Sequence, residues 1–140
     1  MRKNRVKALN GLGNIYLSIY SYDDADSVFR QALEGEHQLG SATGQAINYA
    51  NLGSIYSARG DDEKALDYYR QSMFYNKKDS NLLGMALCHL YFGNIYEKRQ
   101  QYDLALREYE QSDRMMTDLK DLWHALEPRL ALASVYYHTH

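Results

Sequence analysis

Apolar residues recur along this chain in steps of three and four, the spacing that places side chains on one face of a helix. Leu9, Leu12 and Tyr16 show these steps near the start of the chain. The same steps return in residues 49–56 and 65–73, and polar breaks separate the apolar stretches. The pattern therefore predicts an all-α chain of amphipathic helices.

The polar breaks predict where helices end. Gly60 suits the left-handed residue that follows a helix, and Asp61 can then cap the next one. Ser21 and Asp24 have the spacing of a capping box. We expect short breaks within helix pairs, at 21–24, 59–63 and 99–103, and longer breaks between pairs, at 38–44, 77–81 and 118–121.

A five-residue phrase returns every 40 residues. "LGNIY" at 12–16 becomes "LGSIY" at 52–56, "FGNIY" at 92–96 and "LASVY" at 132–136. A fixed period of this length indicates a repeat array, here of helix hairpins that bury their apolar faces by stacking. We expect one domain over residues 1–140, with seven helices in three full repeats and the first helix of a fourth. The expected repeats are about 2–41, 42–81, 82–121 and the partial 122–140.

Three sets of equivalent residues share this period: glycines (Gly13, Gly53, Gly93), alanines (Ala25, Ala65, Ala105) and aromatics (Phe29, Tyr69, Tyr109). A glycine inside a helix costs about 1 kcal/mol relative to alanine. Its recurrence at one place indicates that two helices approach closely there, and we expect the alanines to lie opposite the glycines. We expect the aromatic side chains to fill the space between successive hairpins.

The fourth copy departs from the others. Ala133 replaces the glycine, and Pro128 lies well inside the expected helix. Because proline lacks a backbone donor and clashes with the preceding turn, we expect a kink or a late helix start near Glu127. The apolar residues 130–137 have no second helix to pack against. We therefore expect that this chain is a segment of a longer protein, or that this C-terminal end associates with something, such as another copy of the chain.

The order Leu-Gly-x-x-Tyr, then an alanine, an aromatic and a small residue, resembles the tetratricopeptide repeat. That family's common unit is about 34 residues, so the period here implies longer helices, similar to those of kinesin light chain. The proline that often closes a unit is absent. The resemblance implies a right-handed superhelical solenoid of antiparallel helix hairpins. It also implies a scaffold that binds a peptide or helix in a concave groove lined by the first helix of each hairpin.

The family's groove positions, carried onto this chain, are Asn10, Asn14, Asn51, Ser54, Tyr91, Asn94 and Ser134. Amide side chains suit such a groove because they pair with the donors and acceptors of a peptide backbone. The alternative, that these are merely solvated helix residues, stays open. Some family members clamp a C-terminal carboxylate with two asparagines, matched by Asn14 and Asn51, and three cations. The cationic positions here hold Asn10, Leu87 and Tyr91, so we do not expect that specificity.

Composition narrows the class of partner. The formal net charge is −2. The 14 tyrosines recur at core spacing rather than among basic residues. Both observations argue against a protein that binds nucleic acid. No apolar run approaches the roughly 20 residues of a membrane span. Cys88 is the single cysteine, so nothing indicates an oxidising compartment, and we favour a cytoplasmic location for this segment. We expect a protein or peptide partner, no nucleic acid and no membrane insertion.

The sequence contains no phosphate-binding loop, nucleophile elbow or HExxH motif. His138 and His140 are two residues apart and would point to different faces of a helix. The acidic residues 61–63 are expected to favour the helix dipole rather than to hold a cation. We therefore expect no enzyme activity, no cofactor and no metal. Trp123 is either an exposed anchor for a partner or packed on the third hairpin.

Two hypotheses follow. The first is a non-catalytic interaction module in a regulatory or sensory protein, which binds a peptide or helix in its groove. The second is a self-associating structural spacer without a peptide ligand. They differ in whether the polar first-helix positions or the apolar ends make the contacts.

Overall fold

The structure is a computed structural model that describes residues 3–120 and 122–139, with only the backbone for Leu122 and Trp123. Within these residues the chain forms seven helices and no strand. They are α1 (Lys3–Ser18), α2 (Tyr22–Leu39), α3 (Ala42–Ala58), α4 (Asp62–Lys78), α5 (Leu82–Lys98), α6 (Tyr102–Asp118) and α7 (Leu122–Thr139). The predicted all-α fold of helix hairpins is confirmed. The side chain of Trp123 and the whole of His140 lie outside the described residues.

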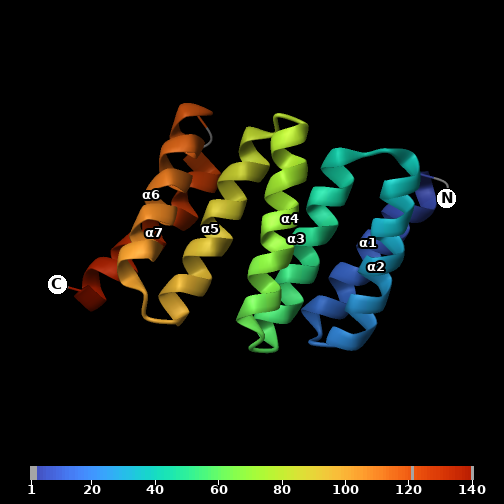
Figure 1. Ribbon diagram of the computed structural model, residues 1–140, viewed down its shortest axis with the longest axis horizontal. Helices are drawn as coiled ribbons and strands as arrows, with labels where there is room; N and C mark the ends of the chain where they lie inside the picture. The colour runs from blue at the N-terminus through green and yellow to red at the C-terminus, as the bar shows by residue number, and fades with distance from the viewer. Residues whose placement is uncertain (1–2, 121, 140) are drawn as a thin grey trace. The chain divides into compact units, whose positions relative to one another are not determined.

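The chain divides into two compact units. Unit 1, Met1–Asp79, holds α1 to α4, and unit 2, Ser80–His140, holds α5 to α7. In unit 1, α1 packs on α2, α2 on α3 and α3 on α4 (Figure 1). In unit 2, α6 packs against both α5 and α7, and α5 also touches α7. The single domain expected over residues 1–140 stays a prediction.

All the connections between helices have one form. Each is two or three residues long. Each contains one residue with a left-handed backbone, twenty residues after the previous one: Tyr20, Gly40, Gly60, Ser80, Gln100 and Lys120, with φ from 52° to 84°. After Tyr20, Gly40, Gly60 and Gln100, the next residue donates its N–H to a carbonyl five residues earlier, as from Ser41 to Glu36 at 3.0 Å. The prediction of longer breaks between helix pairs is wrong, because this compact turn ends first and second helices alike.

Side chains cap three of the described helix starts. Ser41, Asp61 and Asn81 each accept from the backbone N–H three residues on, at 3.0–3.2 Å. The predicted cap at Asp61 is therefore confirmed. The capping box at Ser21 is wrong, because its hydroxyl donates to Oδ2 of Asp24 at 2.7 Å and makes no bond to the helix backbone. A carboxylate is the stronger acceptor for that hydroxyl.

The recurring glycines lie against the recurring aromatic rings. A Cβ on any of the three glycines would lie 2.5–2.6 Å from a ring carbon on the second helix of the same hairpin. The pairs are Gly13 with Phe29, Gly53 with Tyr69, and Gly93 with Tyr109. The close approach of the helices is confirmed, but the nearest neighbours are ring carbons rather than the alanines. The missing Cβ makes room for a flat ring.

Phe29 and Tyr109 also pack against the next hairpin, as predicted. In unit 1 the buried cluster joins α2 to α3 and consists of Ala25, Phe29, Leu52 and Ile55. In unit 2 the corresponding cluster joins α5, α6 and α7 and consists of Leu90, Ala105, Tyr109 and Val135. Burying each large aliphatic or aromatic side chain contributes about 1.5–3 kcal/mol. Tyr109 thus lies at the centre of unit 2, which places its hydroxyl among three helices.

Helix α7 is continuous, and Pro128 lies inside it. The predicted late start near Glu127 is wrong. Pro128 lacks the N–H that would bond to the preceding turn, but buried residues on either side of it keep the helix packed. Ala125, which precedes Pro128, packs with residues of α5 and α6, and so does Val135, which follows it. A kink at Pro128 stays a prediction.

Candidate functional site

Four of the predicted groove residues lie in unit 1. Asn10 and Asn14 are on α1, and Asn51 and Ser54 are on α3. Asn14 is exposed and the other three are half-buried. The hydroxyl of Ser54 lies 3.1 Å from that of Tyr69, so Ser54 bonds within its own hairpin. Asn51 is half-buried on α3, and its place in a binding groove stays a prediction.

Asn10 lines a hollow of about 560 Å³. The hollow is lined by Lys3 and Lys7 of α1 and by Glu36 of α2, among others. The amide oxygen of Asn10 is buried, and no hydrogen-bond partner for it is found in the described part of the chain. Asn51 and Ser54 are not among the residues that line this hollow.

Unit 2 brings two predicted residues together around a carboxylate that the sequence did not single out. Glu97 of α5 accepts a hydrogen bond at Oε2 from the hydroxyl of Ser134 of α7, at 2.8 Å. The hydroxyl of Tyr109 lies 2.8 Å from Oε1 of Glu97 and 2.8 Å from Oδ1 of Asn94. This network connects all three helices of unit 2 and includes both Asn94 and Ser134.

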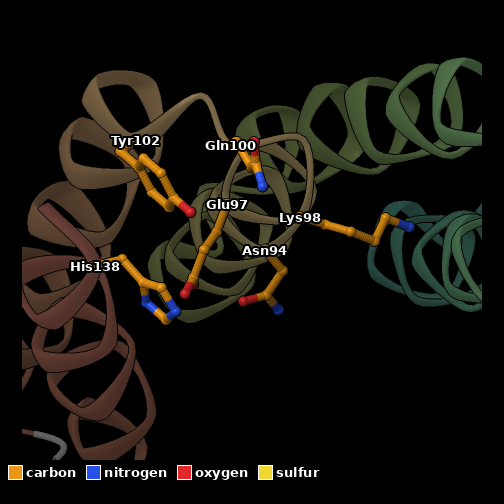
Figure 2. Close-up of a pocket in the computed structure, with 6 residues that line it drawn as sticks. All are labelled: Asn94, Glu97, Lys98, Gln100, Tyr102 and His138. Carbon is orange, nitrogen blue, oxygen red and sulfur yellow. The ribbon is translucent and has the colours of Figure 1, made fainter.

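A pocket of about 400 Å³ opens beside this network. The rings of Tyr102 and His138 stack with their centroids 6.0 Å apart and their planes at 10°. Nδ1 of His138 donates to the carbonyl of Ser134 at 2.8 Å, which leaves Nε2 as an acceptor in the neutral ring. Figure 2 shows the lining residues, and Lys98 extends away from the other five. They are Asn94, Glu97, Lys98, Gln100, Tyr102 and His138.

Burial raises the pKa of two tyrosines of unit 2. Burial raises the pKa of Tyr109 well above its usual value, and the hydrogen bond to Glu97 and the charge of Glu97 add to the increase. Burial also raises the pKa of Tyr91, with smaller contributions from Cys88 and Glu127. Tyr91, the third predicted residue of unit 2, is not among the residues that line the pocket. Both hydroxyls therefore lose their protons at a higher pH than the usual 10.0 of tyrosine.

The sequence prediction missed Glu97, Tyr102 and His138. Glu97 follows Asn94 by three residues and so shares a face of α5 with it. A comparison of the four copies contains a signal for Glu97, because a charge occurs at this position only there. The equivalent residues are Leu17, Ser57 and Tyr137. No sequence pattern pairs Tyr102 with His138, because their approach depends on how α7 packs.

The described residues were also compared with the requirements of a metal site, a reactive thiol and a membrane span. Among residues 3–120 and 124–139, no three His, Cys, Asp or Glu side chains are placed to hold a metal ion. Cys88 is a buried free thiol. His89 pairs with Glu108 at 2.7 Å. None of the helices in the described ranges is long and apolar enough to cross a membrane.

The short turns, the glycine–ring contacts and the polar first-helix network together define a helical-hairpin repeat protein. Residues 4–73 match the sequence profile of the tetratricopeptide repeat. The chain belongs to the tetratricopeptide repeat family. This family is generally a non-catalytic fold that mediates interactions between proteins.

Two solved structures share the fold. BtubC (BKLC) from P. vanneervenii has a TM-score of 0.81 and 18% identity, over 94% of this chain and 55% of that chain. The chain thus spans about half of that protein's length. PcrH, solved in complex with the chaperone binding region of PopD, has a TM-score of 0.77 and 15% identity, over 100% of this chain and 97% of that chain. No curated protein matches the sequence.

Proposed function

We propose that this chain is a non-catalytic module that binds a peptide or helix of a partner protein on the polar faces of its first helices, within a larger regulatory or sensory protein. The observation that carries the proposal is the network of unit 2, where Asn94, Glu97 and Ser134 lie beside an open pocket. Family membership makes a protein partner the expected class. The structure of PcrH with the chaperone binding region of PopD supports a region of a partner protein as the ligand.

The exposed amides give this proposal its chemistry. Asn14 and Asn94 are exposed on α1 and α5, and Asn51 is half-buried on α3. Each amide offers an acceptor oxygen and two donor hydrogens, which match the groups of a peptide backbone. Because asparagine is a mediocre helix former, its recurrence on first helices favours a use beyond folding.

The test is selection of peptides from a random-sequence display library on the immobilised chain. The binding variant carries Asn14→Glu and Asn94→Glu. The matched control carries Gln31→Glu and Gln71→Glu, which add the same charge at exposed positions of α2 and α4. Peptides enriched on the native chain and on the control, but lost from the binding variant, support the proposal. Enrichment equal on all three, or none on the native chain, contradicts it.

A second candidate is self-association through the exposed apolar faces of α1 and α7. Ile15 is 59% exposed, although the equivalent Ile55 of α3 is 0% exposed. Leu130 of α7 is 62% exposed, although the equivalent Leu90 of α5 is 2% exposed. An apolar residue that is exposed here, while its equivalents in other repeats are buried, is typical of a surface that contacts another protein. This candidate needs no peptide ligand.

A further inference from the structure

Glu97 is held in place by two hydroxyl groups from two other helices. Ser134 donates to Oε2, and Tyr109 lies within hydrogen-bond distance of Oε1, both at 2.8 Å. The ring of Tyr109 is 1% exposed, so its hydroxyl is fixed by the core of unit 2. The carboxylate therefore has a defined position at the edge of the pocket.

The carboxylate also has part of its acceptor capacity left. Both hydroxyl donors are neutral, so they stabilise the negative charge without cancelling it. A carboxylate has about four acceptor sites, and these two donors use one on each oxygen. Lys98, the cation among the lining residues, extends away from the other lining side chains (Figure 2). The pocket therefore presents a negative charge with acceptor sites available.

The remaining lining suits a cation. The stacked rings of Tyr102 and His138 form an aromatic surface, and the face of an aromatic ring attracts a guanidinium or ammonium group. Asn94 adds an amide oxygen, and when Nδ1 of His138 carries the ring's single proton, Nε2 adds an acceptor. Negative charge, neutral acceptors and aromatic faces together match a guanidinium more closely than a neutral or anionic group.

The first and second repeats do not pair a tyrosine hydroxyl with a carboxylate at this place. In the first repeat the core ring is Phe29, which is 0% exposed and has no hydroxyl. The hydroxyl of Tyr109 is therefore not required to fill this core position. Glu97 likewise has no charged equivalent in the other copies. The third repeat has both the carboxylate and the hydroxyl that positions it.

We propose that the pocket at Glu97 binds the basic side chain, arginine above all, of the partner peptide. Glu97 contacts the guanidinium, and the rings of Tyr102 and His138 pack against it. Tyr109 and Ser134 are positioning residues that act through Glu97. This inference rests on the proposed function and adds the chemistry of one peptide residue.

The experiment uses two acetylated and amidated tripeptides, Ala-Arg-Ala and its neutral analogue with citrulline in place of arginine. Binding to the full chain is followed by the backbone amide shifts in ¹H–¹⁵N NMR spectra. The variants are Glu97→Gln, Tyr109→Phe and the control Glu110→Gln, which removes the same charge from an exposed position of α6. Thermal unfolding verifies that each variant is folded.

We expect the arginine peptide to bind with a Kd on the order of millimolar, because the site is open to solvent. The shifted amides should include Asn94, Glu97 and Tyr102. The citrulline peptide and the Glu97→Gln variant should each bind about tenfold more weakly, since a charge-assisted bond is lost. Glu110→Gln should bind as the native chain does. Tyr109→Phe should weaken binding of the arginine peptide more than that of the citrulline peptide.

Equal binding of the arginine and citrulline peptides would overturn the inference, as would full binding by Glu97→Gln or no shift at all. The library selection separates this failure from that of the proposed function. Enriched peptides that lack a basic residue and bind Glu97→Gln fully would overturn the inference and leave the function intact. Specific binding of the arginine tripeptide without any enriched library peptide would support the pocket's chemistry and contradict the proposed function.

Discussion

Gly11 and Gly13 lie two residues apart on α1 but have different surroundings. A Cβ on Gly11 would meet nothing within 4 Å, whereas a Cβ on Gly13 would lie 2.5 Å from Cε1 of Phe29. Only Gly13 belongs to the set of glycines that recurs every 40 residues. The recurrence therefore distinguishes Gly13, which packing requires, from Gly11, which packing does not require. At the scale of the residue, comparing the copies was sufficient to find the positions where helices approach closely.

The two glycines should respond oppositely to alanine. Gly11→Ala should raise the free energy of unfolding by about 0.5–1 kcal/mol, because alanine favours the helix. Gly13→Ala should lower it by about 1–2 kcal/mol, because the crowding against Phe29 outweighs the same helix preference. Urea unfolding followed by circular dichroism measures both. An increase for both variants would show that the ring does not need the space.

The left-handed turn residues make a second prediction at this scale. Gln100 and Gly60 occupy equivalent turns, with φ of 61° and 84°. Gln100→Gly should stabilise the protein by about 0.5–1 kcal/mol, since a side chain disfavours this backbone more than glycine's extra freedom costs. Gly60→Gln should destabilise it by a similar amount. Melting temperatures of the two variants measure these changes in stability. A loss for Gln100→Gly together with a gain for Gly60→Gln would show that the two turns are not equivalent.

At the scale of the element, the sequence predicted the helices well and their ends less well. The three-and-four spacing and the capping residue Asp61 sufficed for the helices and for one turn. The longer breaks were wrong because residues at their edges belong to helices, such as residues 42–44 in α3 and residues 77 and 78 in α4, which composition does not reveal. The late helix start predicted from Pro128 was wrong because the packing of buried residues in α7 outweighs the tendency of proline to interrupt a helix.

The packing of tyrosines between helices predicts a loss of stability in alkali. Burial raises the pKa values of Tyr49, Tyr91 and Tyr109 above the usual 10.0. Their contribution is fully present below pH 10. It is lost as the pH rises from there toward the folded-state values, because the unfolded chain then releases protons that the folded chain retains.

Melting temperatures measured from about pH 8 to about pH 11 test this prediction. Tyr109→Phe should be less stable than the native chain by about 1 kcal/mol at neutral pH, since it loses the bond to Glu97. The native chain should lose more stability with rising pH than the variant, so that the difference narrows. Parallel curves for the two proteins would contradict the assignment of this effect to Tyr109.

At the scale of the whole molecule, the sequence could place candidate residues on first helices but could not assemble them. The site of unit 2 draws on α5, α6 and α7, and Glu97 joins residues 37 positions apart when it accepts from Ser134. A period aligns equivalent residues of different copies, and it says nothing about which residues meet across helices. The network therefore needed the packed structure.

Self-association is the prediction that belongs to this scale. If the exposed face of α7 makes contacts between copies, Leu130→Glu should lower the sedimentation coefficient at high micromolar concentration, because a charge in an apolar contact is costly. Phe74→Glu is the matched control, since Phe74 is 61% exposed on α4. An unchanged, concentration-independent coefficient for the native chain would rule out this second candidate.

The most direct measurement is an amide shift map of the full chain with the strongest peptide from the library selection. Peptide binding on first helices predicts that the largest shifts in unit 2 fall on α5 and α7, around Asn94, Glu97 and Ser134. Beyond Tyr102 at the start of α6, the residues of that helix should change little. Shifts concentrated on α6, or on second helices in general, would contradict the assignment of the binding site.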